Sequence, residues 1–110
     1  MSIDYEAVFV IGYFMGNTRD DEDGDLEERV EEICEKLGCY LQLANDGYDE
    51  PFDYYIEPEC KDRDYETKGN PYTPEEINKA IAAAIKVKEK ATAKGITLGD
   101  LYIGPRLLVL

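Results

Sequence analysis

Carboxylates and tyrosines dominate one stretch of this 110-residue chain, residues 46–66. Nine of these 21 residues are Asp or Glu and four are Tyr, and the bases among them are Lys61 and Arg63. Carboxylates can act as general acids or bases, bind divalent cations, or pair with basic groups on a partner. The other residue types in the chain decide which of these three kinds of chemistry is open to it.

Catalysis by these carboxylates is disfavoured by the residues that the chain lacks. It has no histidine, which is the commonest general base, and so no Ser-His or Cys-His pair for nucleophilic catalysis. Two carboxylates serve as acid and base in glycosidases, but among 25 acidic residues some pair lies close whatever the function. The sequence also has no GxGxxG or Walker motif. We therefore expect that the protein is not an enzyme.

The acidic loop of residues 19–25 invites comparison with the calcium-binding loop of an EF-hand. If Gly24 is the loop glycine, Arg19 and Val30 occupy the first and twelfth positions, where acidic ligands are required. With no histidine and scattered cysteines, the chain has almost no ligands for zinc. We expect no cofactor and no specific metal site, and weak binding of calcium or magnesium by the clustered carboxylates stays open.

The net charge of −13 is distributed unevenly along the chain. Residues 1–66 hold 21 acids and 5 bases, net −16, whereas residues 67–110 hold 4 acids and 7 bases, net +3. A surface of this kind repels nucleic acid and anionic membranes, which are both disfavoured as direct ligands. It steers basic partners toward itself. The expected partner is therefore a basic protein.

The three cysteines and the N-terminus indicate a reducing compartment. Cys34, Cys39 and Cys60 include no CxxC pair, and the first ten residues have no basic region typical of a secretory signal. No apolar run approaches the ~20 residues that are needed to cross a bilayer. We expect a cytoplasmic protein with free thiols, and a Cys34–Cys39 disulfide is the less favoured alternative.

Four segments are predicted to be strands. The first is apolar and β-branched without alternation, which is typical of a strand buried on both faces, and Gly12 in it indicates a bulge or a close backbone approach. The second and third flank Asn45-Asp46-Gly47, so they are expected to form a hairpin. The last is interrupted at Gly104-Pro105, which favours an edge position. The predicted strands cover residues 3–15, 39–44, 52–56 and 101–103 with 107–110.

Two helices are predicted, over about residues 26–37 and 74–94. Asp25 is the expected N-cap of the first, with Glu28 as its capping-box partner and Gly38 as its end. The second starts with the capping box of Thr73-Pro74-Glu75-Glu76. Its expected inner face is Ile77, Ala80, Ile81, Ala84, Ile85 and Ala91.

The element order is thus β-α-β-β-α-β, the split βαβ or ferredoxin-like arrangement. It predicts a single α+β domain in which two helices cover one face of a four-stranded antiparallel sheet. Tyr54 and Tyr55 are adjacent on the third strand, so one is expected to face the core and one to face water. An exposed tyrosine favours an interface. The alternative is that these rings pack over the open face of the sheet.

In size, charge and tyrosine content the whole chain resembles small phage-borne inhibitors, including anti-CRISPR and other DNA-mimic proteins. It is also similar to the acidic immunity proteins of nuclease toxins. No family motif accompanies the resemblance, so it assigns no residue roles. It implies an inhibitor of a basic nuclease or another nucleic-acid-binding effector. The alternative is a ferredoxin-like regulatory or ligand-binding domain that forms homodimers through its sheet edge and is acidic only for solubility.

The predicted partner-binding surface combines the outer face of the first helix with the acidic, tyrosine-bearing stretch. Its carboxylates would imitate the phosphates of a nucleic acid, and its tyrosines would anchor the complex. The residues are Glu28, Glu31, Glu32, Glu35, Asp49, Glu50, Asp53, Tyr54, Tyr55, Glu57, Glu59, Asp62, Asp64 and Tyr65.

Overall fold

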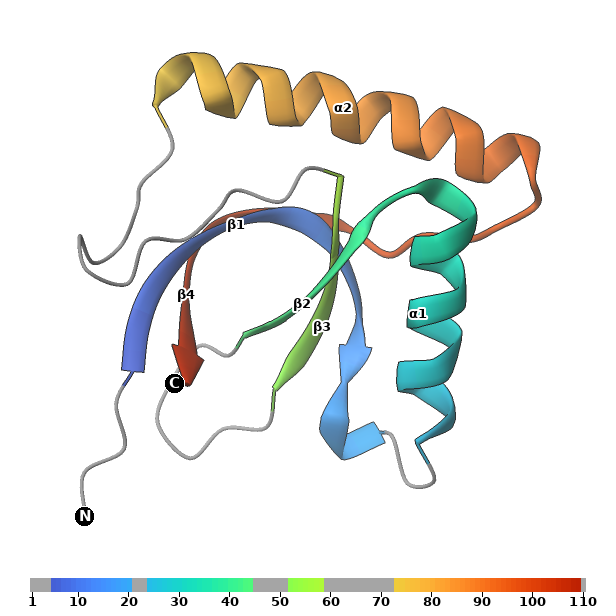
Figure 1. The fold of residues 1–110 in the computed structure, drawn as a ribbon, viewed down its shortest axis with the longest axis horizontal. Helices are drawn as coiled ribbons and strands as arrows, with labels where there is room; N and C mark the ends of the chain where they lie inside the picture. Colours follow the sequence, from blue (N-terminus) through green and yellow to red (C-terminus); the bar gives the residue numbers. More distant parts are fainter. Residues whose placement is uncertain (1–4, 21–23, 45–51, 59–72, 110) are drawn as a thin grey trace.

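The computed structural model describes residues 5–20, 24–44, 52–58 and 73–109. Its sheet is antiparallel with strand order β2-β3-β1-β4, and two helices accompany it. The predicted β-α-β-β-α-β order and ferredoxin-like α+β architecture are confirmed (Figure 1). The elements are β1 (Tyr5–Asn17), the 3-10 helix η1 (Thr18–Asp20), α1 (Asp25–Leu37), β2 (Tyr40–Ala44), β3 (Asp53–Glu57), α2 (Pro74–Ala93) and β4 (Leu101–Val109).

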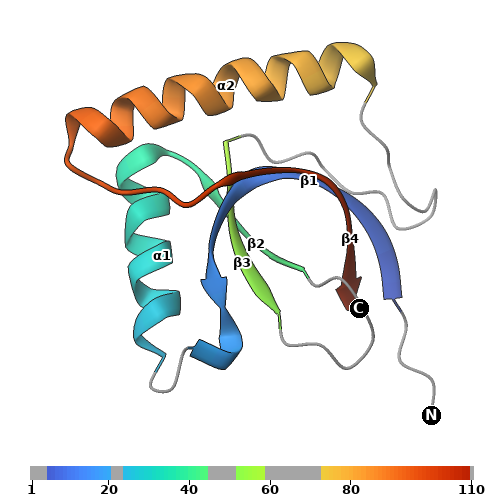
Figure 2. The same cartoon turned by 180° about the vertical axis from the view of Figure 1, so that it is seen from behind.

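The sheet is strongly curved, and both helices lie on its outer side (Figures 1 and 2). β1 and β4 run together through an arch, α2 lies across that arch, and α1 contacts β2 and β3. Alternate residues of each strand point to opposite faces, and both faces carry a core. The outer core includes Val30, Cys34, Tyr54 and Ile56, and the inner core includes Val10, Ala44, Tyr55 and Tyr102.

The N-terminus of α2 has the predicted capping box. Thr73 Oγ1 accepts a hydrogen bond from the backbone N–H of Glu76 at 3.2 Å, and Glu76 Oε1 accepts one from the Thr73 N–H at 3.0 Å. The start of α1 differs from the prediction, because Gly24 is the N-cap at φ 77° and no side chain caps the helix. Asp25 instead lies in the first turn, where its charge favours the helix dipole.

Small side chains bring α2 close to β1. Ala80, Ala84 and Ala91 are buried, and the hydroxyl of buried Tyr13 donates a hydrogen bond to the Ala84 carbonyl at 2.6 Å. Ile85 was expected on this inner face but is exposed. The buried face of the helix is formed mainly by its alanines. Ile85 lies beside this face, on the side of the helix nearer to β4, and its side chain stays exposed.

β4 is continuous through Gly104-Pro105, where the sequence predicts an interruption. The backbone N–H of Phe14 donates to the Asp100 carbonyl at 2.8 Å, and hydrogen-bonded pairs alternate along the ladder from there. Pro105 pairs with Phe9, and in this alternation its nitrogen points away from β1. The predicted edge position of β4 is confirmed, and the proline breaks no ladder bond because its nitrogen faces the open edge.

The hairpin of β2 and β3 and the close backbone approach at Gly12 are also confirmed. A Cβ at Gly12 would lie 2.8 Å from the carbonyl oxygen of Ile56 on the neighbouring strand. The bulge in β1 lies further along, between Phe14 and Gly16. Within the described ranges, no helix combines the length and the apolarity that crossing a bilayer requires.

The Gly12→Ala substitution should lower the free energy of unfolding by roughly 1–3 kcal/mol, because the new methyl group meets backbone that cannot move aside. Gly104→Ala is the comparison, since its Cβ would meet the Tyr102 side chain, 2.8 Å from the hydroxyl oxygen and 3.1 Å from Cζ, and a side chain can shift more readily than backbone. Urea unfolding of both variants measures the difference. A Gly12→Ala protein as stable as the Gly104→Ala protein would contradict the close approach.

Candidate binding surface on the first helix

The side of α1 that points away from the sheet carries four exposed glutamates. Val30, Cys34 and Leu37 are buried at helical spacing on the opposite side. Positions three and four apart share a helix face, so the four carboxylates form one row. We call Glu28, Glu31, Glu32 and Glu35 the acidic stripe.

The acidic stripe is compact. Its four side chains line a shallow hollow of about 180 Å³. The seven-residue step from Glu28 to Glu35 spans roughly 10 Å of helix axis, in intervals of about 4.5, 1.5 and 4.5 Å that average about 3.5 Å per charge. Phosphates along one DNA strand are spaced at ~3.4 Å. The stripe therefore has a linear charge density close to that of a single nucleic-acid strand.

This row of like charges opposes the stability of α1. Glu31 has Glu27, Glu28 and Glu35 at positions i−4, i−3 and i+4, and each such pair destabilises a helix. Glu35 also lies in the last turn, where a negative charge opposes the helix dipole. Glu32 differs, because Arg29 and Lys36 at i−3 and i+4 attract its carboxylate and offset the repulsion from Glu28 and Glu35 at i−4 and i+3.

The two tyrosines of β3 do not reach the surface. Tyr54 is 4 % exposed and Tyr55 is 1 % exposed, so the prediction that one of them faces water is wrong. Tyr54 packs in the outer core beneath α1, and Tyr55 packs in the inner core. The alternative, that the rings pack over the open face of the sheet, is correct for Tyr55, whereas Tyr54 packs on the face that the helices cover. Neither ring is available as an exposed anchor for a partner.

Asp53 belongs to a side-chain network on the inner face of the sheet. Its Oδ1 accepts a hydrogen bond from Asn17 Nδ2 at 2.7 Å, and its Oδ2 accepts one from the Tyr55 hydroxyl at 3.3 Å. Arg106 Nε donates to the same hydroxyl at 3.0 Å, and the guanidinium lies 3.8 Å from the centre of the Tyr102 ring. Burial raises the pKa of Tyr55, and the Arg106 hydrogen bond opposes that rise.

Sequence reasoning missed Arg106 as a member of this network. The available signal was its alternation with Tyr102 and Gly104 along β4, which places all three on one face. Gly104 is needed there, because the Tyr102 ring lies over it. The network holds Asp53 in the fold, which leaves it poorly placed to meet a partner.

The predicted surface is therefore divided by the sheet. The acidic stripe lies outside α1, whereas Asp53 and Glu57 share the inner-face side of β3 with Tyr55. Glu57 is buried, so its assignment to an exposed surface is wrong. Six further predicted residues lie outside the described part of the chain: Asp49, Glu50, Glu59, Asp62, Asp64 and Tyr65.

Cys34 and Cys39 are free thiols, and Cys60 lies outside the described residues. Burial, with smaller contributions from the nearby Cys39 and Glu31, raises the pKa of Cys34 from 9.0 to about 11. Burial also raises the pKa of Cys39, and Lys90 partly offsets that rise. Both thiols are thus neutral near pH 7 and poorly nucleophilic.

No group of three or more His, Cys, Asp or Glu side chains converges to hold a metal ion in the described segments. The four glutamates of the acidic stripe form no such group either. Part of the acidic loop, residues 21–23, lies outside the described segments.

Cys34 should react with iodoacetamide about a hundredfold more slowly at pH 8 than a cysteine of pKa 9.0, because its thiolate fraction is that much smaller. The rate should keep rising until the pH nears 11. Stability should fall between pH 9 and 11, since the unfolded thiol ionises first. Mass spectrometry of the Cys34 peptide, folded and in urea, gives the rates, and equal rates in both states would contradict the raised pKa.

Glu31→Gln should raise the free energy of unfolding by roughly 0.5–1.5 kcal/mol, because it removes three repulsive pairs. Glu32→Gln is the matched control, and it should give no gain because it removes two attractive pairs, with Arg29 and Lys36, together with two repulsive pairs, with Glu28 and Glu35. Thermal unfolding at low and high salt measures both variants. The gain should shrink in high salt, and equal gains for the two variants would show that specific repulsion at Glu31 is not the cause.

The described geometry thus retains four of the fourteen predicted partner-binding residues as one exposed surface, the acidic stripe. Comparison of the chain with protein-family models, curated proteins and solved structures found no significant match.

Proposed function

We propose that this protein is a binding inhibitor of a basic, nucleic-acid-handling protein in the cytoplasm, such as a nuclease, and that it acts without catalysis. The observation that carries the proposal is the acidic stripe, an exposed row of carboxylates whose mean charge per length of helix axis is close to that of a nucleic-acid strand. A basic groove that holds phosphates would accept this row in their place.

The energetics of α1 support a use for the stripe beyond solubility. Solubility requires net charge, but it does not require like charges at adjacent positions of one helix face. Glu31 and Glu35 occupy positions where acids weaken the helix. A row maintained against helix stability is typical of a functional surface.

The uneven distribution of charge gives the complex an orientation. The exposed lysines of α2, among them Lys79, Lys86 and Lys90, would repel a basic partner. The acids of the first 66 residues would attract it, so approach through α1 is favoured. Association driven by such charges is fast and weakens steeply with ionic strength.

The test compares two variants in a binding and competition assay. In the stripe variant, Glu28, Glu31, Glu32 and Glu35 are all changed to Gln, and in the control variant Lys79, Lys86 and Lys90 are changed to Gln. Basic proteins that the wild-type chain retains from a lysate at low salt are purified and loaded with fluorescent duplex DNA. Wild type and the lysine variant should displace the DNA, and the stripe variant should not.

Two results would contradict the proposal. Displacement by the stripe variant as efficient as that by wild type would show that the stripe is not the contact. Retained proteins that bind no nucleic acid would show that phosphate imitation is not the mechanism. Circular dichroism of the stripe variant checks that α1 is still folded.

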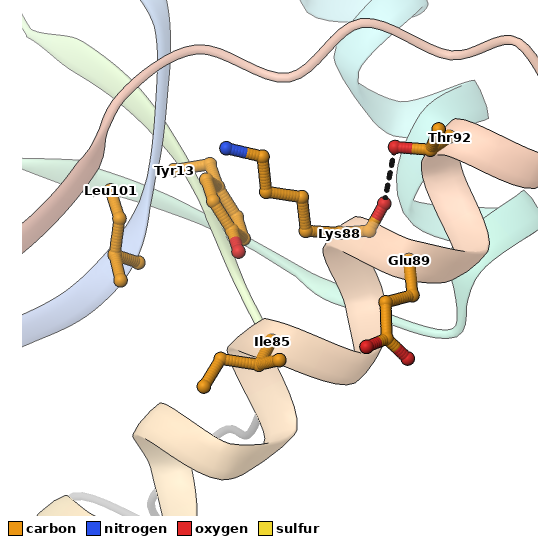
Figure 3. Close-up of a pocket in the computed structure, with 6 residues that line it drawn as sticks. All are labelled: Tyr13, Ile85, Lys88, Glu89, Thr92 and Leu101. Carbon is orange, nitrogen blue, oxygen red and sulfur yellow. Dashed lines mark hydrogen bonds between the residues drawn. The ribbon is translucent and has the colours of Figure 1, made fainter.

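A second candidate function, a ligand-binding or regulatory domain, is favoured by one pocket (Figure 3). It has a volume of about 470 Å³, within the range of small-molecule sites. Tyr13, Ile85 and Leu101 form its apolar lining, and Lys88 extends across it toward Tyr13. Its ligand would be an apolar molecule, whose binding should be nearly independent of salt.

A further inference from the structure

Three exposed apolar side chains gather where α2 faces the β4 edge, beside which no strand pairs among the described residues. Leu101 and Ile103 project from β4 toward the helix side, and Ile85 projects from α2. Leu101 and Ile85 both line the pocket described above. An exposed apolar group beside an open sheet edge is a typical site for strand addition.

The edge of β4 also offers main-chain hydrogen-bonding groups. Asp100 bonds to Phe14, so in the alternating ladder Tyr102 and Gly104 bond to β1. The N–H and C=O groups of Leu101 and Ile103 therefore point to the open side. A new strand laid beside β4 can bond to both residues.

Pro105 limits how far an added strand can pair. It has no N–H, and its carbonyl oxygen already accepts hydrogen bonds from the Tyr102 hydroxyl at 2.8 Å and from Arg106 Nη1 at 3.4 Å. The outward-facing main-chain groups next to α2 are thus limited to a short segment centred on Tyr102. The same segment of a second copy, running antiparallel, can pair with it, so that Leu101 of each copy lies opposite Ile103 of the other.

Local charge favours a second copy over a basic protein at this edge. Two copies with a net charge of −13 each repel one another over most of their surface. Around the β4 edge the charges of the described residues balance, because Lys88 and Arg106 accompany Glu89 and Asp100. A basic protein gains no electrostatic attraction there, whereas a second copy meets little repulsion and covers apolar surface.

We propose that the protein forms a homodimer by antiparallel pairing of two β4 strands about a two-fold axis at Tyr102. Each Leu101 pairs with Ile103 of the second copy, which gives four main-chain hydrogen bonds and a continuous eight-stranded sheet. Ile85 of each copy borders the apolar contact. The dimer is independent of the proposed inhibition, since α1 packs over β2 and β3 and its acidic stripe remains free on both copies.

Sedimentation velocity over a wide concentration range tests the dimer. Wild type should sediment as a dimer at high concentration, and Ile103→Lys should remain a monomer. The matched control is Tyr40→Lys on the opposite edge strand, since Tyr40 is 51 % exposed and Ile103 is 44 % exposed. This control should dimerise like wild type. If the lysine variant fails to fold, Ile103→Thr replaces it in this test. Threonine keeps the β-branched shape but is less apolar, so it should weaken the dimer without unfolding the protein.

Amide exchange and cross-linking test the register. The N–H groups of Leu101 and Ile103 should become protected as protein concentration rises, because they enter the new ladder. In a protein that carries both Leu101→Cys and Ile103→Cys, the opposed thiols lie within disulfide range. Mild oxidation should therefore yield a covalent dimer, which mass spectrometry identifies by the peptides it joins.

High salt separates this inference from the proposed function. The dimer should persist in high salt, where repulsion between the copies is screened, while binding of a basic partner should be lost. The stripe variant should still dimerise, and Ile103→Lys should still bind the partner. A wild-type monomer at every concentration, a dimeric Ile103→Lys protein, or a Tyr40→Lys protein that is monomeric would each overturn the β4 interface.

Discussion

Both faces of the sheet carry a packed core, and this constraint limits which side chains can reach a partner. The helices cover much of the outer face, and on the inner face curvature brings the rings of Phe14, Tyr55 and Tyr102 together. Tyr55 lies 5.9 Å from Phe14 and 5.7 Å from Tyr102 between ring centres. The central strands therefore use Tyr13, Tyr54 and Tyr55 as core residues, and the exposed carboxylates of the described chain are concentrated on α1.

Local signals in the sequence predicted the element order and the α2 capping box, since each depends on residues near one another in the chain. The close approach at Gly12 was signalled by a glycine inside an apolar strand, although its partner, the Ile56 carbonyl, is distant in sequence. Curvature depends on distant contacts, and so the second core was not predicted. Alternation placed Tyr54 and Tyr55 on opposite faces correctly, but it could not show that the face opposite the helices was buried. The prediction of Asp25 as the N-cap of α1 was wrong, because Gly24 adopts a left-handed conformation at that position and the capping pattern in the sequence does not reveal it.

The two parts of the predicted surface differ in how far they depend on the rest of the fold. The acidic stripe followed from helical periodicity, which a single helix satisfies without help from other elements. The contributions of Asp53 and Glu57 depended on the fold around β3, where Asn17 and Arg106 come from strands that are distant in sequence. The distribution of charge along the sequence therefore identified the acidic half of the chain. It did not show which of these acidic residues lie on the same face of the folded protein.

The hydrogen bond from the Tyr102 hydroxyl to Pro105 has a consequence for the behaviour of the protein at high concentration. An uninterrupted β4 would offer a template on which strands of many chains could stack and grow into fibres. Pro105 withholds one donor and its bonded carbonyl withholds an acceptor, so a long in-register stack would leave polar groups without partners. The edge thus tolerates one short, self-limiting contact and resists open-ended polymerisation.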